Sequence, residues 1–213
     1  MSRAWKGKWI CTAEFSELIP RNVYHKELSP ALYRETAEDP QDIHVMFRRS
    51  FELNKSDGRY VLRVSADDYG KYYVNGAFVG QGPTPGYLES FNYNEFDITG
   101  YLRDGENEIR AHVYYQGLNN RVWISRDNRM GLIAEVVRPD GEVILFTDES
   151  WECARIAGYL PARSFGERVQ FQEHYDSRIP MDDYVPVSVR KHNDVVMADA
   201  PTRPLMIYEA TPK

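Results

Sequence analysis

Cysteine is scarce in this chain. Its 213 residues include two, Cys11 and Cys153, which cannot build the disulfide framework typical of small secreted domains. A chain of this length can bury a substantial core without such cross-links. Both cysteines lie in strand-like sequence that contains a tryptophan, and we expect both thiols to be buried, reduced and chemically inert.

Basic charge and long apolar runs are also lacking. Lys and Arg total 26 against 32 Asp and Glu, which gives a formal net charge of −6. That balance argues against a general nucleic-acid binder, because such a protein needs a basic face for phosphates. No apolar run approaches the roughly 18 residues of a membrane-spanning helix, and residues 1–8 lead into no signal peptide. We therefore expect a cytoplasmic protein that contacts neither nucleic acid nor membrane.

Helical periodicity is the third scarce feature. Only Leu28–Asp39, confined by Pro30 and Pro40, predicts a short helix. Alternating apolar residues between turn signals predict short strands instead, which favours a β-sandwich or a barrel. The expected strands lie within 47–53, 59–66, 71–80, 91–96, 108–115, 131–137, 142–147 and 151–156. We expect one β-domain over residues 1–156, and an irregular extension over 157–213 that returns strands at 185–189 and 205–208 to the same domain.

The clearest local prediction is a hairpin. Tyr72–Val74 and Ala77–Val79 flank Asn75-Gly76, a pair that readily takes the positive φ angles of a type I′ turn.

Common catalytic and metal-binding motifs are missing. The five histidines show no HExxH or zinc-finger spacing, and no GxSxG motif occurs. Gly80-Gln81-Gly82 lacks the Gly-Lys-Ser/Thr ending of a phosphate-binding loop, and the sequence predicts a plain turn there. The sequence therefore predicts no catalytic residue.

Two groups of residues are candidates for carbohydrate contact. The first is Trp123, Asp127, Asn128 and Arg129, and the second is Asp67, Asp68 and Tyr69. An aromatic ring can pack on the C–H face of a sugar while acid, amide and guanidinium groups bind its hydroxyls. The acids also suit calcium, which prefers oxygen ligands. Each group also has a purely structural interpretation. The first group would lie in a loop that its own Arg–Asp pair holds in place, and the second would form a turn at the end of a strand.

Several motifs resemble one family. Ser65–Gly76 followed by Val79–Pro83 is similar to the accessory β-domain of bacterial α-L-rhamnosidases, as are Asp97–Leu102 with Gly105–Ile109, and Thr147–Trp151. Related patterns occur in the jelly rolls of β-galactosidases. The resemblance implies an antiparallel jelly-roll β-sandwich with a galactose-binding-like fold. In that family a separate, downstream helical barrel carries the two carboxylates that perform inverting hydrolysis, and nothing in this chain resembles that barrel.

Three interpretations follow. The chain is a non-catalytic accessory domain of an α-L-rhamnosidase-like glycoside hydrolase, a free-standing module that binds rhamnose or a related sugar with or without calcium, or a small enzyme with a site of its own. We expect the first, with a missing downstream catalytic domain and a rhamnose-containing glycan as partners. A reading frame that continues well past Lys213 would favour it over the second.

Overall fold

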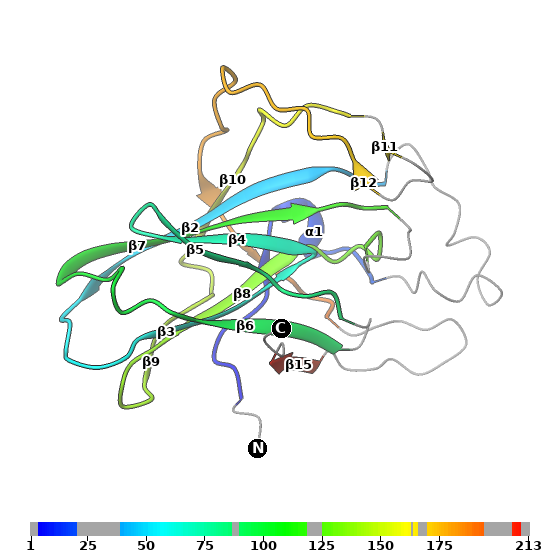
Figure 1. The fold of residues 1–213 in the computed structure, drawn as a ribbon. Coiled ribbons are helices and arrows are strands. Elements are labelled where there is room, and N and C mark those ends of the chain that lie inside the picture. The colour runs from blue at the N-terminus through cyan, green and yellow to red at the C-terminus, as the bar shows by residue number, and fades with distance from the viewer. Residues whose placement is uncertain are drawn as a thin grey trace.

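A computed structural model describes residues 4–20, 39–86, 90–118, 125–162, 164–165, 170–193 and 206–209. These residues form two β-sheets packed face to face, as Figure 1 shows. The described part contains one helix, the short α1 (Ala13–Ser16), which the sequence did not predict. The helix expected at 28–39 lies outside the described residues except for Asp39.

Within the described residues, the first sheet has the order β14 (Ser188–Val189), β1 (Ile10–Cys11), β8 (Gly131–Val137), β3 (Val61–Asp67), β6 (Ser90–Asp97) and β15 (Met206–Glu209), and β9 (Val143–Phe146) also pairs with β8. The second sheet has the order β13 (Val185–Pro186), β10 (Glu152–Arg155), β2 (Ile43–Leu53), β7 (Gly105–Tyr115), β4 (Tyr69–Val74) and β5 (Ala77–Gly82). Two further strands, β11 (Ser164–Phe165) and β12 (Gln170–Phe171), pair with each other. All these pairs are antiparallel except β15 with β6, which is parallel. The predicted antiparallel β-sandwich is confirmed.

The core lies between the two sheets because the strands alternate apolar and polar residues. In β2, Val45 and Phe47 are fully buried, while His44, Met46 and Arg48, which alternate with them, remain partly exposed. Successive side chains of a strand point to opposite faces, so this pattern gives each sheet one apolar face. Burying a side chain of this kind stabilises the fold by about 1.5–3 kcal/mol.

The predicted hairpin is confirmed. β4 and β5 pair with Val74 opposite Ala77, and the turn between them is Asn75-Gly76. Both turn residues have positive φ, 50° for Asn75 and 81° for Gly76, as a type I′ turn requires. The side-chain amide Nδ2 of Asn75 also donates to Tyr101 O and Asn107 Oδ1, each at 2.8 Å.

Both cysteines are buried and free, as predicted. Burial raises the pKa of Cys11 to about 12 and that of Cys153 to about 11. Both thiols therefore stay protonated near neutral pH, and a protonated thiol is a poor nucleophile.

The segment after β10 crosses the outer face of the second sheet and then contributes strands to both sheets. Figure 1 shows it above β2, with β12 near one end. β13 then pairs with β10, and β14 pairs with β1. Among the described residues, no helix has the length and apolar character needed to cross a membrane.

Candidate functional site

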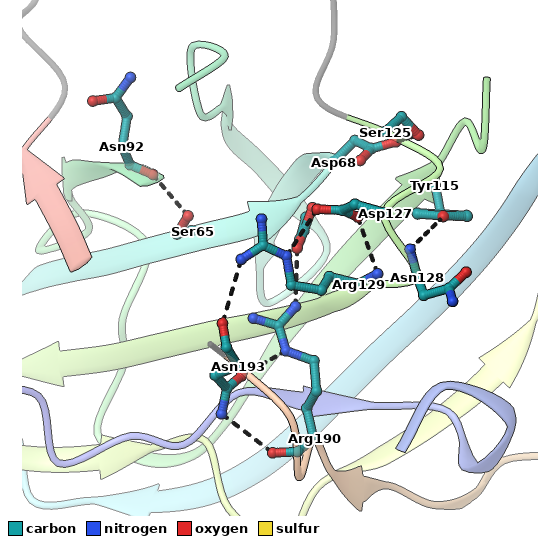
Figure 2. Close-up of polar contacts among 11 residues, drawn as sticks. Ser65, Asp68, Asn92, Tyr115, Ser125, Asp127, Asn128, Arg129, Arg190 and Asn193 are labelled. Carbon is teal, nitrogen blue, oxygen red and sulfur yellow. Dashed lines mark hydrogen bonds and ion pairs between the residues drawn. The ribbon is translucent and has the colours of Figure 1, made fainter. Parts of the chain in front are cut away.

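The two groups of candidate residues meet at one end of the first sheet. β3 ends at Asp67, which pairs with Gly131 at the start of β8. Asp127 and Arg129 immediately precede β8, so the register of β3 and β8 places both groups side by side. Figure 2 shows the resulting cluster of polar side chains.

Two arginines provide the positive charge of this cluster. Arg129 Nε donates to Asp127 Oδ2 at 2.8 Å, and Arg190 Nη1 donates to Asp67 Oδ2 at 2.9 Å. The four side chains are at most 1% exposed. Sequence analysis missed Arg190, which follows β14 and reaches Asp67 from 123 residues away. Its guanidinium also lies over the Trp9 ring, 4.3 Å from the ring centroid.

Asp68 adds a third carboxylate. Its Oδ2 accepts hydrogen bonds from the Gln116 amide at 2.8 Å and from the Ser125 hydroxyl at 2.5 Å. The Ser125 oxygen in turn accepts from the Gly117 amide at 2.6 Å. Asp68 therefore fixes the chain just after β7 against the segment that leads to β8.

Three carboxylates thus face two guanidiniums in the interior. Burial is the largest cause that raises the pKa of Asp67, to about 7, and the charge of Asp127 adds to it. Burial and the neighbouring Asp67 raise the pKa of Asp68 well above its usual range. The cluster therefore retains a proton at neutral pH, which balances its charge.

The predicted site residues have different locations. Asp67, Asp68, Asp127, Asn128 and Arg129 are all buried. Asn128 donates its side-chain amide to Ile19 O at 3.1 Å. Tyr69 is partly exposed, and Trp123 lies outside the described residues. The five buried residues hold the loops together, and their contact with carbohydrate stays a prediction.

A pocket of about 240 Å³ opens on the outer face of the second sheet. β2, β7 and β4 form its floor, and residues 159–160 and 170–174 of the extension lie opposite this floor. Tyr69 and Asp68 line it, so it adjoins the buried cluster. Sequence analysis missed this pocket, because its walls come from segments far apart in the chain.

A pair of histidines lies in the pocket. The register of β2 with β7 brings His44 beside His112, with Nδ1 of the first 2.9 Å from Nε2 of the second. The His44 ring stacks between Tyr114, at a centroid distance of 4.4 Å, and Tyr159, at 3.5 Å. Burial lowers the pKa of His112 to about 3, with the charges of His44 and Lys71 adding to the effect. His112 is therefore neutral over the physiological range.

Within the part of the chain that the structure describes, no three His, Cys, Asp or Glu side chains are grouped to hold a metal ion. In the buried cluster, Asp67 and Asp127 bind guanidinium groups. A role for calcium stays a prediction.

Comparison with known proteins identifies the family. A model of the α-L-rhamnosidase N-terminal domain matches residues 59–212. The chain belongs to this family. As an α-L-rhamnosidase N-terminal domain, it shares its fold with a GH78 rhamnosidase of Bacillus sp. GL1, with a TM-score of 0.66 and 26% sequence identity. That match covers 88% of this chain and 18% of the Bacillus chain.

Two other proteins extend the comparison. The α-L-rhamnosidase of Dictyoglomus thermophilum has the same fold, with a TM-score of 0.58 and 19% identity, over 96% of this chain and 22% of that one. A β-galactosidase of Clostridium acetobutylicum is 32% identical over 90 residues, which are 42% of this chain and 9% of that protein. This N-terminal domain therefore spans only a small part of the length of the glycosidases it matches.

Proposed function

We propose that this chain acts as a non-catalytic accessory domain of an α-L-rhamnosidase-like glycoside hydrolase, where it supports the catalytic domain and contacts a rhamnose-containing glycan. The family match over residues 59–212 carries the proposal. The short share of the Bacillus rhamnosidase that the chain covers supports it, because most of such an enzyme lies elsewhere.

The test starts from the gene that encodes this chain. We would express the complete reading frame with and without residues 1–213, and measure hydrolysis of an aryl α-L-rhamnoside and of a rhamnose-containing oligosaccharide. We expect the intact protein to hydrolyse both. The shortened protein should lose thermal stability, or lose more activity on the oligosaccharide than on the aryl substrate. An intact protein without rhamnosidase activity would overturn the proposal.

A second candidate is a free-standing carbohydrate-binding module, which the pocket on the second sheet favours. A reading frame that encodes no catalytic domain, together with saturable binding of a sugar, would support this alternative. Titrations with and without calcium would test the contribution of the ion.

A further inference from the structure

We infer that the pocket between the outer face of β2, β7 and β4 and residues 159–160 and 170–174 binds one neutral sugar ring of a glycan. The inference rests on the proposed carbohydrate contact and assigns it to a place outside the buried Asp–Arg cluster. Its evidence is the size of the pocket, the aromatic and polar groups that line it, and its balance of charge.

The pocket suits a single ring. Pockets for drug-sized ligands hold roughly 300–1,000 Å³, and this one holds about 240 Å³. On the rim, Gln172, Glu173 and His174 are exposed, so a chain attached to the bound ring has a path to solvent.

Aromatic surface is available for the C–H face of a sugar. Tyr69, Tyr114 and Phe171 line the pocket and are partly exposed. The two tyrosines lie opposite each other on β4 and β7. The His44 ring stacks with both Tyr114 and Tyr159 and so holds Tyr114 in place, which lowers the ordering cost of binding.

Donors and acceptors occur together around these rings, as hydroxyl groups require. Lys71 provides donors, Glu173 provides acceptors, and Gln170 provides both. His44 and His112 form a hydrogen-bonded pair, in which one ring nitrogen donates to the other. Because the acids Asp42 and Glu173 line the pocket together with Lys71, the lining has no positive excess for a phosphate or a carboxylate ligand.

Titration of the full chain with methyl α-L-rhamnopyranoside and methyl β-D-galactopyranoside, followed by NMR, tests the inference. We expect saturable, millimolar binding of one of these probes. Tyr69→Ala should weaken it about tenfold, and Lys71→Ala on the floor and Glu173→Ala on the rim should each weaken it severalfold. Tyr101→Ala is the matched control, since Tyr101 is an exposed tyrosine outside the pocket. Melting temperatures would show that each variant is folded.

The outcomes separate this inference from the broader proposal. Binding that survives all three pocket changes would reject the pocket and leave carbohydrate contact standing elsewhere. No binding of either probe at about 50 mM, far weaker than a millimolar site, would reject both the pocket and the carbohydrate contact. A role as accessory domain would then rest on the deletion experiment alone.

Discussion

Single residues determine how the buried cluster holds its charge. Arg129 and Arg190 lie in the interior, where an unpaired guanidinium would be costly, and each has an aspartate within 3 Å. Such a pair adds little net stability over apolar residues of the same size, but removing one partner leaves the other charge uncompensated. The cluster is therefore sensitive to changes that remove a single charge.

We predict that Asp127→Ala destabilises the domain by about 3–5 kcal/mol, because it removes the buried carboxylate to which both the backbone N–H and Nε of Arg129 donate. Urea unfolding followed by tryptophan fluorescence would measure the change. Asp183→Ala is the control, since Asp183 is exposed, and it should change the free energy of unfolding by less than about 0.5 kcal/mol. Equal effects of the two changes would contradict a structural role for the cluster.

The raised pKa values of Asp67 and Asp68 predict a dependence of stability on pH. In the unfolded chain both acids lose their protons near pH 4, whereas the folded cluster holds a proton toward pH 7. The folded state thus binds more protons between these values, and the free energy of unfolding should fall as the pH rises from 5 to 8. For one proton, the free energy of unfolding should fall by up to about 1.4 kcal/mol per pH unit.

Asp68→Asn tests the origin of this slope. The amide oxygen keeps an acceptor for Ser125 and Gln116, while the titrating group is gone. We expect a flatter profile and higher stability at pH 8 than in the parent. Asp183→Asn should leave the slope unchanged, and a parent protein whose stability rises from pH 5 to 8 would refute the assignment.

At the scale of elements, the β4–β5 hairpin depends on backbone conformation more than on packing. A Cβ added at Gly76 would meet nothing within 4 Å, yet φ there is +81°. We predict that Gly76→Ala lowers the free energy of unfolding by about 1–2 kcal/mol, because a residue with a Cβ is strained in the left-handed backbone conformation. Gly100→Ala is the matched control, because that position is equally open and lacks a positive φ. Thermal unfolding of both variants would show the difference, and equal melting temperatures would argue against it.

Strands with a clear pattern could be predicted from the sequence, and so could the short β13 and β14, which lie within the strand expected at 185–189, but the other two-residue strands could not. β8 was expected at the residues where it occurs, because seven residues between turn signals show it plainly. β1, β11 and β12 have two residues each, and two residues show no period. β2 begins at Ile43 rather than near residue 47, since the alternation continues through Val45.

The candidate site was harder to predict, because local sequence does not show which distant segments meet. Local sequence identified Asp67, Asp127 and Arg129 as unusual, but it did not show that Arg190 would pair with Asp67 in the interior. The His44–His112 contact depends on the register of two 11-residue strands, which no local pattern determines. Contacts between distant segments decide whether a polar residue faces solvent or the interior.

For the molecule as a whole, we predict that the isolated chain does not hydrolyse aryl α-L-rhamnosides. A glycosidase of the common type needs two carboxyl groups across the scissile bond. Asp67, Asp68 and Asp127 are instead committed to buried contacts. A chromogenic assay would measure this, and turnover that disappears on mutation of a residue within the chain would contradict it.

The pairing of β1 with β14 affects how the chain can fold during synthesis. Ile10 pairs with Val189, and the Arg190 amide donates to Trp9 O at 2.9 Å. Contacts between such distant residues give a high contact order, which slows folding. On the ribosome β1 can pair with β8 earlier, but its pairing with β14, and the ion pair of Asp67 with Arg190, cannot form until residue 190 has emerged. This edge of the first sheet is therefore completed late in synthesis.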